Sequence, residues 1–255
     1  MFQKLEDSRM NKLKGLFNLE LKKTIRTPII MFFSILAPQF FIYIQSSLSE
    51  EVIMNGQSIP SIDYSFPMFL YLAVIVVGIG NVGVGMSYNR LIKFFTRLKV
   101  SNVRAIDFIV ANFFVQLSIA VLSTLLLFLS SILVLDMSLE GRNWTIFFLV
   151  FFLVWIMTYL IGIVLANIVK DAKTSQSVSL IVYFFLIFFS GVTYPIELMP
   201  ELLQKISKLL PTYYGLRILQ EAWYINGNID TTHLIIVIGS TVILFVISLK
   251  IFKFD

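Results

Sequence analysis

Long apolar runs recur along this chain, and they constrain its fold more than any other feature of the sequence. A helix needs about 20 predominantly apolar residues to cross the hydrocarbon core of a bilayer. Runs of this length return from the first quarter of the chain to its end, separated by short polar connections. Only 14% of the residues are charged, against about 25% in soluble domains. We therefore expect an integral membrane protein, with a single membrane domain over residues 1–255 and no soluble module.

The positions of the runs predict an all-α protein with six transmembrane helices. Pro38 lies inside the first run, where it predicts a kink. Residues 1–28 lack a continuous apolar run, so we expect the first span, and not a cleaved signal peptide, to direct insertion. The expected spans are residues 29–48, 66–88, 106–135, 144–169, 175–192 and 233–251.

An amphipathic interfacial helix is predicted within residues 1–28. Four apolar side chains recur at the spacing of one helix face, whereas four lysines lie largely elsewhere around the helix. The apolar residues are Leu13, Leu16, Phe17 and Leu21, and the lysines are Lys12, Lys14, Lys22 and Lys23. The alternative interpretation of this segment is ordinary positively charged flanking sequence.

The basic residues are distributed unevenly between alternate connections. Seven Lys and Arg residues precede the first span, five lie in residues 89–105, two in residues 170–174 and two after residue 249, against four in the other connections together. Because cytoplasmic connections carry an excess of Lys and Arg, we expect both termini in the cytoplasm and residues 190–219 on the outer face. The same distribution argues against nucleic acid as a partner, because the bases do not form one continuous patch.

Residues 190–219 differ from a plain membrane anchor, because prolines and charged residues follow the fifth apolar run directly. Proline lacks a backbone donor, so Pro195 is expected to end that helix. We predict short re-entrant helices here, with Pro195, Pro200 and Pro211 at the turns. The residues that define this segment are Ser190, Gly191, Pro195, Glu197, Met199, Pro200 and Pro211.

Glycines cluster within the second run. Gly78, Gly80 and Gly83 match the GxGxxG pattern of dinucleotide-binding folds, but that pattern needs a preceding strand, and here it lies inside a predicted span. We therefore interpret these glycines, with Gly85, as a helix packing or hinge face. Asn81 either forms a hydrogen bond to another helix or is satisfied within its own helix.

The sequence offers little for catalysis or for proton-coupled transport. No predicted span has a charged residue near its middle, His233 is the only histidine, and cysteine is absent. A phosphate loop of the form GxxxxGK[ST] is also absent, so this chain is not itself a phosphate-loop ATPase. We expect no enzyme active site, no metal site and no cofactor bound by this chain.

The connection over residues 89–105 interleaves basic and aromatic side chains. This mixture is typical of a docking helix that binds a cytoplasmic partner, although a topology signal alone is the alternative. The candidate docking residues are Arg90, Lys93, Phe94, Phe95, Arg97, Lys99 and Arg104.

The combination of these features resembles the membrane subunit of the ABC-2 family of ATP-binding-cassette exporters. The shared features are the amphipathic amino-terminal helix, six spans, the basic connection after the second span and the proline-containing segment after the fifth. The resemblance implies that residues 90–104 form the coupling helix seated on a separate ATPase subunit, which binds ATP and Mg²⁺. It also implies that residues 190–219 close the exit, and that two permease protomers, identical or different, pair in a bacterial plasma membrane among its lipids.

The function implied by the resemblance is export of an amphiphilic substrate, such as a drug, an antibiotic, a peptide or a lipid. Polysaccharide and glycan exporters of the family carry an Arg-Asp pair and a Ser, Leu and Gly cluster before the first span, where residues 21–38 read LKKTIRTPIIMFFSILAP. That departure favours the drug or bacteriocin branch. The alternative from another class is a channel or secondary carrier that uses no ATP.

Overall fold

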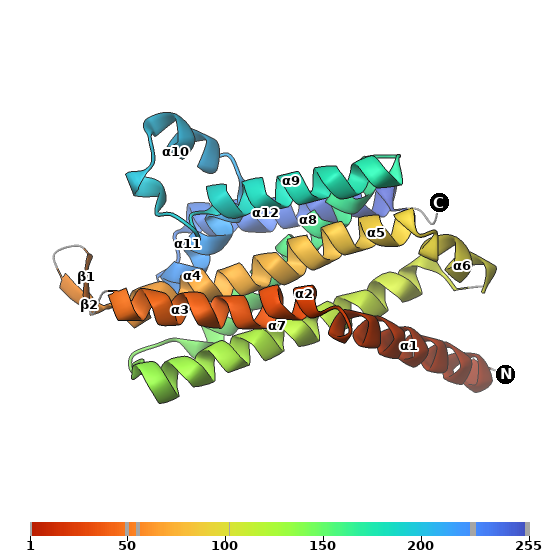
Figure 1. Ribbon diagram of the computed structural model, residues 1–255, viewed down its shortest axis with the longest axis horizontal. Coiled ribbons are helices and arrows are strands. Elements are labelled where there is room, and N and C mark those ends of the chain that lie inside the picture. Colours follow the sequence, from red (N-terminus) through yellow and green to blue (C-terminus); the bar gives the residue numbers. More distant parts are fainter. Residues whose placement is uncertain (1, 49–50, 55–56, 102, 225–227, 253–255) are drawn as a thin grey trace.

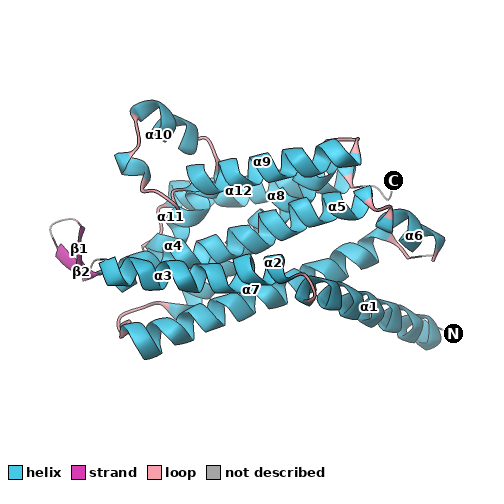
Figure 2. Ribbon diagram, viewed as in Figure 1, coloured by secondary structure: helices cyan, strands magenta, loops and turns pink. Residues whose placement is uncertain are grey.

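Six helical segments in the described part of the chain are long and apolar enough to cross a membrane, which confirms the predicted number of spans (Figure 1). The computed structural model describes residues 2–48, 51–54, 57–101, 103–224 and 228–252. Helices make up nearly all of this structure (Figure 2). Spans 1 to 6 are Pro28–Leu48, Ser61–Leu91, Ala105–Leu135, Trp144–Ile168, Ala172–Ser190 and Thr231–Ile251.

Span 1 is preceded by α1 (Phe2–Ile25) and consists of α2 (Pro28–Met31), the π-helical segment η1 (Phe32–Leu36) and α3 (Ala37–Leu48). The helix is irregular just before Pro38, where a kink is predicted, because the π-helical segment η1 ends immediately before the turn that contains this proline. Proline cannot donate to the carbonyl four residues earlier, which is that of Ser34. The Ser123 hydroxyl donates to this carbonyl instead, at 2.6 Å.

Span 2 consists of α4 (Ser61–Ile75), the π-helical segment η2 (Val76–Val84) and α5 (Gly85–Leu91). It is longer at both ends than the predicted residues 66–88. The sequence prediction excluded the polar residues at its start, but Asp63 in the first turn of α4 pairs with Arg142 and is buried with it. At the other end the helix continues to Leu91 before the chain turns.

The remaining spans are α7 (Ala105–Leu135), α8 (Trp144–Ile168), α9 (Ala172–Ser190) and α12 (Thr231–Ile251). Helix α9 begins before the predicted residue 175 because Asp171 accepts a hydrogen bond from the backbone N–H of Thr174, at 2.7 Å, and so caps its amino terminus. It ends before the predicted residue 192 because Gly191 adopts a left-handed conformation, with φ of 91°.

Spans 2 and 4 form the interior of the bundle, and the other spans surround them. In the most apolar part of span 2, 72% of the residues are buried, compared with 11% in span 6. Helix α8 packs against η2 on one side and against α9 and α12 on others. Spans with so many exposed apolar residues suit contact with lipid chains or with another membrane helix.

Short elements lie at the two ends of the bundle. At one end, α6 (Phe94–Val100) lies near the amino and carboxyl ends of the described chain (Figure 1). At the other, a hairpin of β1 (Glu51–Met54) and β2 (Gln57–Pro60), which we did not predict, pairs Val52 with Ile59. The same end of the bundle carries η3 (Ile196–Leu198), α10 (Glu201–Ser207) and α11 (Pro211–Trp223), the short helices predicted after span 5.

Candidate functional site

The predicted docking connection forms a corner followed by a short helix. Lys93 has a left-handed backbone with φ of 56°, so the chain turns sharply between α5 and α6. Helix α6 has only seven residues, which corrects the expectation that residues 90–104 form a single coupling helix. Span 2 continues to Leu91, and this leaves less of the connection for a separate helix.

The aromatic residues of this connection point into the bundle. Phe95 is 1% exposed, and its ring centroid lies 5.1 Å from that of Phe108 on α7. The ring centroid of Phe94 lies 5.9 Å from that of Phe108. Phe94 and Phe95 therefore attach α6 to span 3. Burial of Phe95 corrects its assignment to a partner-binding surface, whereas Phe94 is only partly buried and its role there stays a prediction.

Two of the five predicted basic residues are engaged within the chain. Arg90 belongs to α5, and its guanidinium donates to the carbonyls of Ala166, Val169 and Lys170 at 2.7–2.8 Å. It thereby caps the carboxyl end of α8, where helix carbonyls lack backbone partners. Arg104 forms an ion pair with Asp107 at 2.9 Å.

The other three predicted basic residues are Lys93, Arg97 and Lys99, and all three are exposed. No ion pair joins them to another side chain in the described ranges. These three exposed basic side chains lie on and beside α6, and we call them together the α6 basic surface.

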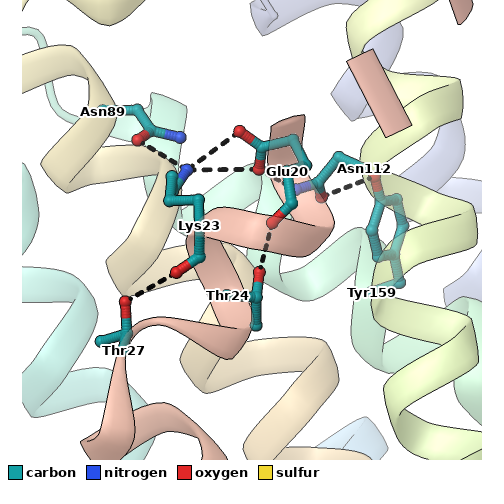
Figure 3. Close-up of polar contacts among 7 residues, drawn as sticks. All are labelled: Glu20, Lys23, Thr24, Thr27, Asn89, Asn112 and Tyr159. Carbon is teal, nitrogen blue, oxygen red and sulfur yellow. Dashed lines mark hydrogen bonds and ion pairs between the residues drawn. The ribbon is translucent and has the colours of Figure 1, made fainter. Parts of the chain in front are cut away.

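A buried polar network lies beside this surface and was not predicted (Figure 3). Glu20 of α1 is 1% exposed, and its carboxylate contacts the Lys23 ammonium at 3.0 Å. Asn112 of α7 donates its side-chain N–H to the same carboxylate at 3.1 Å. The hydroxyl of Tyr159 on α8 donates to the Asn112 side-chain oxygen at 3.3 Å. Lys23 is only partly buried, but its removal would leave the buried Glu20 carboxylate without its positive partner, and an unpaired buried charge is costly.

Helix α1 is amphipathic as predicted, but its packed face is not purely apolar. Leu16 is buried, and Lys12, Lys14 and Lys22 are exposed. Lys23 is partly buried, which corrects its assignment to the polar side. Glu20 follows Leu16 by four residues and therefore shares its face. That spacing was the only sequence signal for a buried acid.

Three of the four glycines of span 2 pack closely against neighbouring helices, Gly78 and Gly83 against α8 and Gly80 against α9. A Cβ atom at Gly78 would lie 2.5 Å from the Thr158 hydroxyl, and one at Gly162 would collide with the Gly78 carbonyl. Gly80 faces the ring of Tyr183, and Gly83 faces the backbone of Gly162. At Gly85 a Cβ would meet no atom within 4 Å, so the packing interpretation is wrong for that residue.

Asn81 forms the interhelical hydrogen bond that was one of its two interpretations. Its side-chain N–H donates to the hydroxyl of Ser34 in η1, at 2.9 Å. On the α9 side of span 2, the Ser87 hydroxyl lies 3.0 Å from that of Ser175 and 3.1 Å from that of Ser179. Polar contacts thus connect span 2 to spans 1 and 5.

At the opposite end, the three predicted prolines begin the three short helices. Pro195 and Pro200 occupy the N-cap positions of η3 and α10, and Pro211 is the first residue of α11. Proline suits helix starts because the first helical N–H groups have no intrahelical acceptor. Ser190 and Met199 are buried, so their side chains support this segment from within.

Helix α11 returns into the bundle and is held there by groups from elsewhere. The hydroxyl of the fully buried Tyr71 donates to the Thr212 carbonyl at 2.7 Å. Arg142 donates to the Trp223 carbonyl at 2.8 Å and to the Asp63 carboxylate at 2.5 Å. Burial lowers the pKa of Arg142, although the Asp63 carboxylate partly opposes this effect. Helix α4 therefore holds both ends of α11: Tyr71 contacts Thr212 near its start, and the Asp63 carbonyl accepts from the Trp223 side chain at its end.

A more exposed ion pair joins Glu197 of η3 to Arg217 of α11. Partial burial alone would raise the pKa of Glu197, but backbone hydrogen bonding, Arg217 and Lys208 lower it overall. Glu201 is exposed at the start of α10. His233 contacts Glu221 at 2.7 Å, and no group of three or more potential metal ligands occurs among the described residues.

An apolar groove of about 540 Å³ lies between α7, α8 and α12. Its wall includes Phe113, Phe245 and the ring of Tyr159, whose hydroxyl belongs to the buried network. The groove begins at Ala105, the first residue of α7, and therefore lies toward the α6 end of the bundle.

Comparisons with known proteins agree with this arrangement. The protein named "Putative transport permease YvfS" of Bacillus subtilis (strain 168) is 22% identical over 205 residues, which cover 80% of this chain and 82% of that protein. A family model for ABC-2 type transporters matches residues 11–224, from within α1 to the end of α11. The chain therefore belongs to the ABC-2 type transporter family.

Proposed function

We propose that this chain is the permease subunit of an ATP-binding-cassette exporter. In this proposal a separate cytoplasmic ATPase binds ATP and Mg²⁺ and drives the transport of an amphiphilic substrate out of the cytoplasm or the inner leaflet. Family membership supports the role of a transporter permease. The identity of the driving subunit, the direction of transport and the substrate class are our inferences.

The observation that carries the proposal is the α6 basic surface. A basic residue that serves only to orient the protein in the membrane needs no defined backbone conformation. Here, in contrast, Lys93 forms a corner and Phe95 anchors a short helix. Arg97 and Lys99 then remain exposed on a supported helix, a geometry suited to an acidic or polar groove on a partner. Both described ends of the chain lie at this end of the bundle, which the excess of basic residues assigns to the cytoplasm (Figure 1).

The segment from η3 to α11 is the proposed exit gate. It lies at the end of the bundle opposite α6, and the start of span 2 holds α11 through Tyr71 and Asp63. Because α6 follows directly from the other end of span 2, a displacement of α6 can be transmitted through span 2 to the gate. A second protomer would complete the path, since the exposed apolar faces of spans 1 and 5 suit a partner of the same kind.

An amphiphilic substrate is favoured by the character of the groove between α7, α8 and α12. Most of its lining is apolar, and the groove opens among membrane-spanning helices near the α6 end. The departure of residues 21–38 from the polysaccharide exporter pattern supports the same choice.

The proposal is tested by purifying the tagged chain from membranes in a mild detergent. We expect a phosphate-loop ATPase to co-purify in a fixed ratio. Proteoliposomes containing both proteins, with the ATPase facing outward, should take up a fluorescent cationic amphiphile when ATP and Mg²⁺ are added. Vesicles with the permease alone are the control. Sustained uptake by the permease alone would instead support a channel or a secondary carrier.

A further inference from the structure

The buried network of Figure 3 brings together four helices that are distant in the sequence. Glu20 and Lys23 come from α1, Asn89 from α5, Asn112 from α7 and Tyr159 from α8. Ion pairs between residues three positions apart in a helix are common on protein surfaces, where they contribute little to stability. This pair differs because its carboxylate is 1% exposed and its other contacts reach α5 and α7 directly and α8 through Asn112.

Lys23 contacts both sides of the corner that precedes α6. Its ammonium donates to the Asn89 side-chain oxygen at 3.0 Å, four residues before Lys93. The same ammonium lies 5.3 Å from the ring centroid of Phe94, the residue after Lys93. A lysine ammonium has three donors and also attracts an aromatic face, so one side chain can hold both segments. The corner cannot change its angle without altering at least one of these contacts.

Glu20 fixes Lys23 in relation to spans 3 and 4. The carboxylate accepts from Lys23 through both oxygens, at 3.0 and 3.2 Å, and from Asn112 at 3.1 Å. Because a carboxylate only accepts hydrogen bonds, the Asn112 amide nitrogen faces Glu20. The Tyr159 hydroxyl lies 3.3 Å from the Asn112 side-chain oxygen and 3.1 Å from the Ile109 carbonyl, so it connects this contact to α8.

We propose that Glu20 and Lys23 are positioning residues for coupling. They link the corner before α6 to α1 and to spans 3 and 4, so that a displacement of α6 moves these helices together. The inference rests on the proposed function, because it takes the ATPase as the source of that displacement. It adds residues outside the α6 connection to the coupling path.

The test uses Lys23→Met with Lys22→Met as its matched control. Both substitutions remove one positive charge from α1, but the Lys22 side chain is exposed and makes no hydrogen bond or ion pair that the structure describes. Because the chain has no cysteine, Leu133→Cys and Leu209→Cys can carry spin labels at the far end without background. Both positions are strongly exposed, at 76% and 81%. Electron–electron distance measurements on the complex with its ATPase then report movement of the gate.

We expect Mg²⁺ and ATP, trapped with vanadate, to change the distance distribution between these labels in the otherwise unmodified complex. Lys23→Met should reduce the trapped population by about fivefold or more, whereas Lys22→Met should leave it unchanged. Co-purification of the ATPase should be equal in both variants. Equal gate responses in Lys23→Met and Lys22→Met would overturn the coupling role while leaving the proposed function intact.

A double variant, Glu20→Gln with Lys23→Met, separates coupling from folding. It removes both charges, so no buried carboxylate is left without a partner, and the glutamine can still accept from Asn112. A monodisperse complex that still lacks the gate response supports the positioning role. Recovery of the response would show that the pair only balances charge, and would refute the proposal. If the unmodified complex fails to assemble with an ATPase, the proposed function and this inference both fail.

Discussion

At the scale of single residues, this protein places its buried charges near the two ends of the bundle and keeps them paired. Glu20 is paired with Lys23 at the α6 end, and Asp63 with Arg142 at the gate end. Removing a charge from water is costly, so such groups persist only with close partners. The ring of Trp223 adds to the second pair, because the Arg142 guanidinium lies 3.7 Å from its centroid.

The burial of the Asp63–Arg142 pair predicts a large loss of stability when one partner is removed. Arg142→Met leaves the Asp63 carboxylate and the Trp223 carbonyl without their donor. We expect the free energy of unfolding to fall by about 3–5 kcal/mol. The loss is measured by thermal unfolding in detergent, with Asp63→Asn combined with Arg142→Met as the charge-balanced variant.

The Glu197–Arg217 pair serves as the control for this prediction. The Glu197 side chain is 59% exposed, and exposed ion pairs contribute about 0–1 kcal/mol. Arg217→Met should therefore lower stability by no more than about 1 kcal/mol. Equal losses for Arg142→Met and Arg217→Met would contradict the distinction between the two pairs.

The lowered pKa of Glu197 predicts how the gate segment responds to acid. A carboxyl whose folded pKa is depressed stabilises the fold above its unfolded pKa, and this contribution is lost as the pH falls through the folded value. The ordinary value is 4.5, so η3 should remain attached to α11 at pH 5 and loosen only below that range. Arg217→Gln removes a cause of the lowering and should move the transition to higher pH. The mobility of a spin label at Leu209→Cys reports the transition, and an unchanged midpoint would contradict this account.

At the scale of elements, span 2 combines close packing with irregular helix geometry. The π-helical segment η2 contains Gly78, Gly80 and Gly83, and it packs directly on α8. Segments of π-helix are frequently found at functional sites. Gly78 permits a contact with α8 that a side chain would prevent, and Gly80 lies close to the ring of Tyr183 on α9.

Alanine substitutions distinguish the packed glycines from the free one. Gly78→Ala would place a Cβ 2.5 Å from the Thr158 hydroxyl, and we expect a loss of about 1–3 kcal/mol from overpacking. Gly85→Ala meets no atom within 4 Å and should be neutral, or more stable by up to about 1 kcal/mol, because alanine favours a helix. Thermal unfolding of both variants in one detergent provides the comparison. A stable Gly78→Ala variant would mean that η2 and α8 are less closely packed than described.

Charge reversal on α6 tests the docking surface directly. Arg97→Glu with Lys99→Glu should weaken association with the ATPase by about tenfold or more, because both side chains are exposed and unpaired with any described residue. Lys205→Glu with Lys208→Glu makes the same change in charge at the gate end. Affinities measured in detergent should be unchanged for this second variant. Equal weakening in both would indicate an effect of net charge alone.

Patterns of hydrophobicity and proline predicted most of the elements, because both act locally along the chain. The six spans and the helix starts at Pro195, Pro200 and Pro211 follow from such local rules. Contacts between distant segments were not predictable in this way. Arg90 appeared to be a docking residue, yet it caps α8, and nothing near Glu20 indicated that Asn112 would become its partner.

At the scale of the whole molecule, span 2 connects the two ends on which the proposed function depends. Its α5 end leads into the corner before α6, and its α4 end holds α11 through Tyr71 and Asp63. The interior position of span 2 allows it to act on several neighbours at once, since it contacts spans 1, 3, 4 and 5. A movement of α6 can therefore reach the gate without passing through the lipid-exposed helices.

The opposite placement of α6 and the gate predicts that the two ends react from opposite sides of the membrane. Val100 and Leu209 are 85% and 81% exposed, so cysteines at these positions should react equally with a maleimide once the membrane is dissolved. In intact cells, a membrane-impermeant maleimide should label Leu209→Cys and leave Val100→Cys unmodified, because the proposed function and the excess of basic residues both predict that α6 lies in the cytoplasm. Labelling of both positions in detergent is the control for reactivity. The reverse pattern in cells would place the α6 basic surface outside, where no cytoplasmic ATPase could reach it, and the proposed function would be wrong.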